Sequence, residues 1–255
     1  MASKLLTLTL AILLLPLCLM GQNQQGKYIK IDYLEVNQQQ LDRFTDSVID
    51  RLKEIQRDRV SSADIDSWAI YRVLYSGSAY RDYNFVSVTV SDSMSSFDSF
   101  NSSFTDAIRL ESERNRYAIS KSEIWTIRNS LNDNQSEAPS NYMMMDYMEV
   151  KLGRELEYQM LEDEVAKPLH EERLETDTME GWEMYQLVTP GGINYGYNFA
   201  TGNYFTDLDH IEFGFNEELI RSQNPNVDLM EFFNQIWSTR DLVRSEVWQL
   251  VDYTN

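Results

Sequence analysis

The side chains of residues 27–36 fall into two alternating sets along the chain. Side chains of an extended chain point to opposite faces in turn, so a period of two residues predicts a β-strand. One face of this predicted strand carries Ile31, Tyr33 and Glu35, and the other carries Asp32, Leu34 and Val36.

The next segment, residues 37–59, has apolar residues at helical spacing. They recur every three or four positions and form one stripe, which is typical of an amphipathic helix. A similar stripe follows residue 151, where we expect Pro168 to kink or shorten the helix. The two stripes consist of Leu41, Phe44, Val48, Leu52 and Ile55, and of Leu152, Leu156, Met160, Val165 and Leu169.

Shorter segments complete the pattern. Residues 67–75 and 83–90 are predicted strands separated by a turn around Gly77. Later in the chain, the corresponding turn is Pro190-Gly191-Gly192, a sequence that favours a turn more strongly. A second helix and a closing strand follow this pair of strands, and the same two elements follow the later turn. The helices are marked by Phe97, Phe100, Phe104 and Ile108 and by Leu229, Phe232, Phe233 and Ile236, and the closing strands cover 122–127 and 245–251.

The chain also resembles itself at a fixed offset. Residues 31–36 recur as residues 145–150, 114 positions later, and the closing strands repeat at an offset of 123. We therefore predict two homologous halves, 27–132 and 141–255, joined by a polar linker at 133–140. The matching positions are Trp68 and Trp182, Tyr71 and Tyr185, Tyr83-Asn84-Phe85 and Tyr197-Asn198-Phe199, and Lys121-Ser122-Glu123-Ile124-Trp125 and Arg244-Ser245-Glu246-Val247-Trp248.

Each half has the order β-α-β-β-α-β, which is the ferredoxin-like arrangement of an α+β protein. A four-stranded sheet with both helices on one face leaves its other face bare, so we expect the two sheets to pack against each other as an intramolecular α/β barrel. The chain thus resembles the dimeric α/β-barrel superfamily in a fused form. Its Trp-x-x-Tyr, Pro-Gly and Tyr-Asn-Phe motifs are similar to those of secreted tandem-repeat proteins of Bacteroidota.

Residues 1–21 have the three parts of a secretory signal peptide. Lys4 is followed by an apolar run at 5–15, and Pro16 precedes the small Gly21. A retained anchor is the alternative, but the apolar stretch is shorter than the ~20 residues that span a bilayer. We expect cleavage near Gly21 and a secreted or periplasmic protein with no membrane span. Cleavage would also remove Cys18, so no disulfide is expected.

The charge and aromatic content of the chain limit the kinds of molecule that we expect it to bind. Asp and Glu total 41 against 22 Lys and Arg, a net charge of -19, which disfavours binding to nucleic acid. Aromatic residues make up 12% of the chain, enough apolar surface to exclude a disordered protein. An unknown small molecule or a cell-envelope protein is the expected partner, and the chain is expected to be a monomer or a weak dimer.

The candidate ligand-binding residues are the repeated aromatic and acidic positions of the strands. Glutamates on the first strand of each half would have perturbed pKa values if their side chains entered the space between the sheets. Core packing of the aromatic residues and a solvent-facing position of the glutamates are the alternatives. The candidates are Tyr33, Glu35, Trp68, Tyr71, Tyr147, Glu149, Trp182, Tyr185 and Tyr197.

Other chemistry has less support. His170 could serve as an axial haem ligand, but a partly exposed helix residue is the favoured interpretation. Residues 206–212 hold Asp207, Asp209, His210 and Glu212, yet they lack the glycine of a tight calcium loop, so no metal site is expected. No cofactor is predicted, with haem kept as the less favoured choice.

The resemblance implies several functions, because the barrel superfamily includes cofactor-independent monooxygenases, haem enzymes and ligand-binding proteins. We find no catalytic constellation in the residues. The favoured hypothesis is therefore an exported, non-catalytic protein of the cell envelope that binds a small molecule or a partner. The alternatives are a monooxygenase-like enzyme, cofactor-free or haem-dependent, and a structural envelope protein.

Overall fold

The computed structural model describes residues 26–76, 82–98, 117–132, 138–192, 194–212, 214, 216–223, 225–226 and 228–255. Several predictions lie outside these residues. They concern the signal peptide at 1–21, the turn at Gly77, the helix positions Phe100, Phe104 and Ile108, and most of the linker at 133–140.

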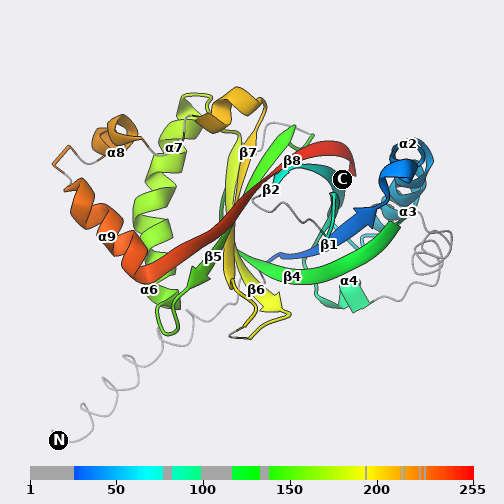
Figure 1. Cartoon of the computed structure of the whole chain (residues 1–255), viewed down its shortest axis with the longest axis horizontal. Coiled ribbons are helices and arrows are strands. Elements are labelled where there is room, and N and C mark those ends of the chain that lie inside the picture. The colour runs from blue at the N-terminus through cyan, green and yellow to red at the C-terminus, as the bar shows by residue number, and fades with distance from the viewer. Residues whose placement is uncertain are drawn as a thin grey trace, which may run out of the picture.

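Among the described residues, eight antiparallel strands close into a barrel in the order β1-β3-β2-β8-β5-β7-β6-β4 (Figure 1). Each half contributes a sheet with the same internal order, β4-β1-β3-β2 and β8-β5-β7-β6. The strands are β1 (Tyr28–Val36), β2 (Ser67–Ser76), β3 (Phe85–Ser91), β4 (Tyr117–Asn132), β5 (Tyr142–Val150), β6 (Gly181–Thr189), β7 (Phe199–Phe205) and β8 (Arg240–Thr254).

The predicted α+β barrel of two ferredoxin-like sheets is confirmed, with one addition. The sheets also join edge to edge, because β2 pairs with β8 and β4 pairs with β6. An open sheet edge leaves backbone N–H and C=O groups unpaired, and these two pairings satisfy them. The barrel is therefore one continuous hydrogen-bonded wall.

Helices cover the outside of the barrel, those of the first half on one flank and those of the second half on the opposite flank (Figure 1). No described helix has the length and apolar character needed to cross a bilayer. The first-half helical segments are η1 (Gln38–Gln40), α2 (Leu41–Arg43), the π-helical turn η2 (Phe44–Val48), α3 (Ile49–Ser61) and α4 (Ser95–Asp98). The second-half segments are α6 (Glu155–Leu161), the π-helical turn η3 (Glu162–Ala166), α7 (Lys167–Glu175), η4 (Leu208–Glu212), α8 (Glu217–Gln223) and α9 (Leu229–Thr239).

The residues of the first predicted helix stripe are buried or half-buried, but the second stripe is wrong in its first half. Leu152 is 93% exposed and Leu156 is 71% exposed. Leu152 precedes the helix, which begins at Glu155, and Leu156 lies on the exposed face of α6. Tyr158 and Leu161 are buried in their place.

The repeated Tyr-Asn-Phe motif has a physical explanation in its asparagine. The Asn84 side chain accepts from Val36 N at 2.9 Å and donates to Val36 O at 2.8 Å. Asn198 makes the same two bonds with Val150, at 2.8 and 3.0 Å. Each asparagine thus satisfies the last backbone groups of a neighbouring strand, and no apolar residue could replace it.

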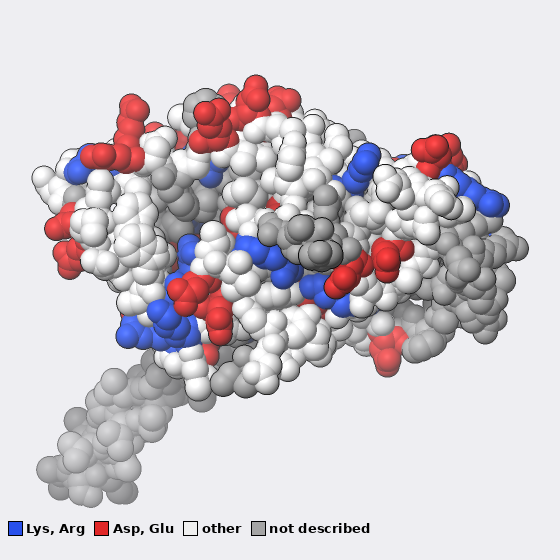
Figure 2. Space-filling view, viewed as in Figure 1, with Lys and Arg blue, Asp and Glu red and all other residues white. Residues whose placement is uncertain are grey.

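Exposed carboxylates crowd the edge formed by α7, η4 and α8 (Figure 2). Like charges at this density repel, and salt screens that repulsion over ~10 Å at 0.1 M. We expect the melting temperature to rise when NaCl is added. The exposed carboxylates of this edge are those of Glu171, Glu175, Asp207, Asp209, Glu212, Glu217 and Glu218.

Calcium at matched ionic strength is the control for this prediction. No group of three or more potential metal-ligating side chains occurs within the described part of the chain, so calcium should act only as salt. A melting temperature that does not change with either NaCl or calcium would contradict the proposed repulsion between carboxylates.

Candidate active site

The two ends of the barrel interior differ in how they are filled. At the end where β1 and β5 finish, tyrosine, tryptophan and charged side chains fill the interior. At the opposite end the interior opens into a cavity.

Glu123 of β4 is the centre of the filled end. It is fully buried, and its carboxylate accepts from the hydroxyls of Tyr33 at 2.7 Å and of Tyr195 and Tyr197 at 2.5 Å. Lys121 Nζ donates to the same carboxylate at 2.9 Å. Burial alone would raise the pKa of Glu123, but Lys121 and the tyrosine hydroxyls outweigh burial and hold the pKa below its usual value.

Glu246 of β8 repeats this arrangement in the second half. It accepts from Arg244 Nε at 2.9 Å, from Trp248 Nε1 at 3.0 Å and from the Tyr83 hydroxyl at 2.5 Å. Tyr83 belongs to the first half, and Tyr197 of the second half reciprocates by binding Glu123. These crossed hydrogen bonds connect the two halves of the chain.

The centre of this end is a contact between equivalent tyrosines. The hydroxyls of Tyr33 and Tyr147 lie 2.8 Å apart. Lys121 lies 4.0 Å from the ring centre of Tyr33, and the Arg244 guanidinium lies 4.0 Å from that of Tyr147. Each cation is thus paired with a carboxylate and stacked on a ring, so these charges are compensated inside the barrel.

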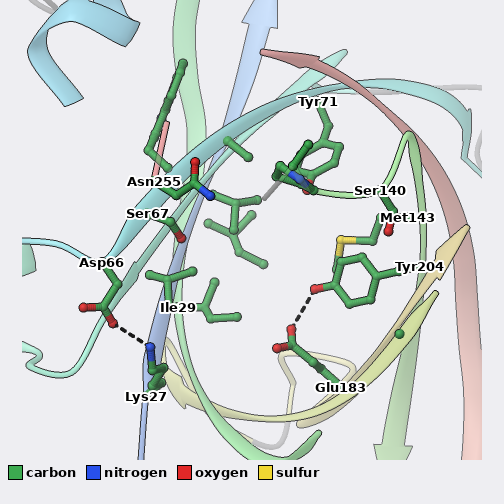
Figure 3. A pocket seen from close by; sticks show the side chains of 18 of the residues that line it. Lys27, Ile29, Asp66, Ser67, Tyr71, Ser140, Met143, Glu183, Tyr204 and Asn255 are labelled. Atoms are coloured by element: carbon green, nitrogen blue, oxygen red, sulfur yellow. Dashed lines mark hydrogen bonds and ion pairs between the residues drawn. The ribbon is translucent and has the colours of Figure 1, made fainter. Parts of the chain in front are cut away.

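The opposite end holds a cavity of about 680 Å³ (Figure 3). Aliphatic side chains of β1 and β3 form one wall, and the aromatic rings of β2, β6 and β7 form the other. Lys27 and Asp66 pair at 3.1 Å at its mouth. The lining includes Ile29, Ile31, Ala69, Tyr71, Val88, Val90, Ser140, Met143, Glu183, Tyr185 and Tyr204.

Glu183 is the polar centre of the cavity. Its Oε2 accepts from Tyr185 at 2.5 Å and from Tyr204 at 2.6 Å, and the two tyrosine hydroxyls lie 2.8 Å apart. Among the described residues, no hydrogen bond to Glu183 Oε1 is found. One carboxylate oxygen is therefore fixed by tyrosines while the other is available to a ligand.

Three tyrosines of the cavity are held as neutral phenols. Burial raises the pKa of Tyr71, Tyr185 and Tyr204, and the charge of Glu183 raises each of them further. Neutral phenols are hydrogen-bond donors. Because Tyr185 and Tyr204 donate to Glu183 Oε2, the cavity presents the Tyr71 hydroxyl as a donor and Glu183 Oε1 as an acceptor.

Gly202 of β7 makes room for this arrangement. A Cβ atom at Gly202 would lie 2.6 Å from Met143 Cε and 2.7 Å from the Tyr185 hydroxyl oxygen. Both distances are shorter than van der Waals contact. Only glycine lets the Tyr185 ring cross this strand and reach Glu183.

The structure distributes the predicted aromatic ligand residues over three places. Tyr71 and Tyr185 line the cavity, and Trp68 borders it while its indole donates to Ser87 under α3. The filled end contains Tyr33, Tyr147 and Tyr197. Trp182 packs outside the barrel wall against His170, with ring centres 5.1 Å apart.

The interior position considered for Glu35 and Glu149 is wrong. Both side chains are exposed. Each lies one residue from the end of its strand, where the rim of the barrel meets solvent. The interior carboxylates come from other strands.

The residues that sequence reasoning missed carried two different signals. Glu123 and Glu246 belong to the repeated closing-strand motif, in which a glutamate stands at the same position of both halves. Glu183 and Tyr204 stand where the first half has Ala69 and Val90, at the 114-residue offset. At these positions the second half has a polar residue where the first half has an apolar one. Such a difference on the interior face of the sheet is the sequence signal that would have indicated Glu183 and Tyr204.

His170 is a core residue of the second half, so the expectation of a partly exposed helix residue is wrong. It is 3% exposed, and burial, with the nearby charge of Arg173, lowers its pKa from 6.5 to about 3. The equivalent position in the first half is Gln56, which is also buried. The structure thus places His170 under Trp182, and not in the cavity.

This burial predicts an acid sensitivity. Below pH 6.5 the unfolded chain binds a proton at His170 that the folded chain does not, so stability falls as pH falls, by ~1.4 kcal/mol per pH unit until the folded pKa is reached. His170→Gln should remove this part of the pH dependence, as measured by urea unfolding between pH 7 and about 5. An unchanged pH dependence in the variant would contradict a neutral, buried His170.

The fold has known counterparts, although no protein-family profile matches the chain and no curated sequence matches it significantly. A candidate monooxygenase from Fusobacterium nucleatum has a TM-score of 0.58 at 10% identity, over 90% of this chain and 94% of that one. One from Lactobacillus acidophilus has a TM-score of 0.54 at 10% identity, over 90% and 96%. An anthrone oxidase-like protein has a TM-score of 0.53 at 9% identity, over 91% and 94%. At these identities the likeness shows the dimeric α/β-barrel fold alone.

These relatives correct the favoured functional hypothesis. A non-catalytic binding protein of the cell envelope was expected, but two of these structures are named as candidate monooxygenases and the third as an anthrone oxidase-like protein. The names favour the monooxygenase-like alternative over the non-catalytic one.

Proposed function

We propose that the protein is an oxygenase that oxidises a flat aromatic substrate with an acidic C–H or O–H group in the cavity. The observation that carries the proposal is Glu183, a carboxylate with one oxygen fixed by two tyrosines and the other open to a cavity of about 680 Å³. A cavity of this volume is within the usual size of sites for small organic ligands.

Glu183 would act as the general base. Its open Oε1 would take a proton from the substrate, and the hydroxyl of Tyr71 would donate to the oxygen on which negative charge develops. The resulting electron-rich anion would react with O₂. For a methylene substrate, one oxygen atom becomes the new carbonyl, and the other leaves as water with the two hydrogens of that carbon.

The described residues do not fit a haem in this cavity. Neither histidine lines it, since His170 packs outside the wall and His210 lies in η4. A tyrosinate ligand would need an ionised phenol, whereas burial and Glu183 raise the pKa of Tyr185 and Tyr204. No step of the proposed reaction is assigned to haem.

Oxygen uptake with a panel of substrates tests the function. Purified protein would be mixed with anthrones, hydroquinones and polycyclic phenols under ¹⁸O₂, and the products analysed by mass spectrometry. We expect enzyme-dependent uptake and one ¹⁸O atom in the product. A panel that produces neither, with folded protein, would contradict the proposal.

Export is a separate part of the proposal, supported by the tripartite pattern of residues 1–21. The expected mature protein begins near Gln22 and acts in the periplasm or outside the cell. Mass spectrometry of protein from the native host tests this, and an intact or acylated Cys18 would contradict it.

A further inference from the structure

A chain of aromatic side chains leads from the cavity into the filled end. Tyr71 lines the cavity, and its ring centre lies 6.1 Å from that of Trp248. The Trp248 indole donates to Glu246 Oε2 at 3.0 Å, and the Tyr83 hydroxyl donates to Oε1 of the same carboxylate at 2.5 Å. Glu246 therefore connects an indole on the cavity side to a phenol at the far end.

The row of aromatic side chains continues to the opposite rim of the barrel. Ring centres of Tyr83 and Tyr33 lie 4.7 Å apart, and the hydroxyls of Tyr33 and Tyr147 lie 2.8 Å apart. Tyr147 lies 4.8 Å from Tyr197, which lies 5.1 Å from Tyr195, again between ring centres. Tyr195 is half-buried and reaches solvent. The aromatic chain thus crosses the whole interior.

Proton acceptors lie beside the phenols of this chain. A tyrosine that loses an electron becomes strongly acidic, so its oxidation requires a base for the hydroxyl proton. Glu123 accepts from Tyr33, Tyr195 and Tyr197, and Glu246 accepts from Tyr83. Burial raises the pKa of Tyr33 and Tyr197, which keeps them as protonated phenols until they are oxidised.

We propose that these side chains form a tyrosine relay that carries an oxidising equivalent from the cavity to the protein surface. The relay consists of Tyr71, Trp248, Tyr83, Tyr33, Tyr147, Tyr197 and Tyr195. Its use in oxygenation rests on the proposed function, because the oxidant would be a substrate phenoxyl or peroxyl radical that escapes productive reaction.

The electrons and protons balance along the relay. The cavity radical takes a hydrogen atom from Tyr71 and becomes a phenol or hydroperoxide. One electron then moves toward the cavity at each step. Trp248 and Tyr83 release their protons to Glu246, and Tyr33 and Tyr197 release theirs to Glu123. Tyr147 passes its proton to Glu123 through the Tyr33 hydroxyl, and each side chain regains its proton on reduction. Tyr71 recovers a proton from water in the cavity, and Tyr195 finally loses one electron and one proton. A soluble one-electron reductant, such as a thiol, restores Tyr195.

The transfer can be tested without the substrate. Ser140 lies at the cavity (Figure 3), so Ser140→Cys in a Cys18→Ser background provides one attachment point for a ruthenium photo-oxidant. Flash oxidation in the presence of a nitroxide trap should produce a tyrosyl radical signal and an adduct on Tyr195, located by peptide mass spectrometry.

Phenylalanine variants separate the relay from direct attack by the oxidant. Tyr83→Phe keeps the ring but removes its oxidisable hydroxyl, and we expect the Tyr195 adduct to be lost. Tyr142→Phe alters a tyrosine of the helix-side core outside the relay and should keep the adduct. Tyr195→Phe should retain a tyrosyl radical signal, now from buried rings, without the surface adduct.

Two results would overturn the proposal. An adduct yield that is the same in Tyr83→Phe and in its parent would show that oxidation reaches Tyr195 by another path. Equal losses in Tyr83→Phe and Tyr142→Phe would show that the effect is unspecific. If Tyr83→Phe does not fold by circular dichroism, Tyr33→Phe interrupts the next step. Failure of substrate oxygenation alone would leave these results unchanged.

Discussion

Glu183→Gln is expected to lower the kcat of oxygenation by ~10²–10⁴-fold, the usual contribution of a positioned general base. Glutamine retains a carbonyl oxygen that can accept from Tyr185 and Tyr204, so the cavity should keep its shape. It has no basic oxygen for the substrate proton. Steady-state oxygen uptake measures the effect, and binding of the substrate should change much less than kcat.

Glu180→Gln is the matched control. Glu180 also lines the cavity, but its carboxylate accepts from Thr206 Oγ1 at 2.5 Å and is not held by tyrosines. We expect its kcat to remain at the level of the unmodified protein. If both variants lose activity equally, the negative charge of the cavity and not the position of Glu183 is what the reaction requires.

Glu123→Ala is expected to produce the largest loss of stability. It would leave Lys121 and the donors Tyr33, Tyr195 and Tyr197 without their acceptor in the interior. Removing one partner of a buried charge pair costs ~3–5 kcal/mol, because the other charge remains uncompensated. Urea unfolding, read as the midpoint together with the slope, measures the change in the free energy of unfolding.

Alanine variants of two further glutamates serve as comparisons for the stability loss expected of Glu123→Ala. Glu246→Ala should cost less than Glu123→Ala, because Glu246 accepts from a smaller set of described donors, Tyr83, Arg244 and Trp248. Glu35→Ala, on an exposed side chain, should change the free energy of unfolding by less than ~0.5 kcal/mol. Equal and small effects at Glu123 and Glu35 would mean that the interior network contributes nothing measurable to folding.

The architecture was predictable because its signals are local or repeated. A period of two along residues 27–36 and a helical period after residue 37 follow from the geometry of strands and helices. The 114-residue offset then made each half support the interpretation of the other. A bare sheet face in each half was sufficient to infer that the sheets pack together.

The second helix shows where a periodic pattern fails. Its apparent stripe began at Leu152, but the helix starts at Glu155 and contains a π-helical turn. A wide turn inserts a residue without leaving any mark on the pattern. In α6, which precedes that turn, packing decides which face is buried, and Tyr158 lies against Phe199 with ring centres 5.1 Å apart.

The chemistry of the interior depended on closure of the barrel, which is a tertiary event. The sequence by itself determined the strands, the first helix, the duplication and the aromatic positions, because each follows from spacing along the chain. Only the tertiary structure decided that Tyr83 meets Glu246 from the other half, and that Tyr71 of β2 faces the cavity with Glu183 of β6. Strand pairing across the two junctions sets those neighbours, and side chains far apart in sequence carry no periodic sign of such a contact.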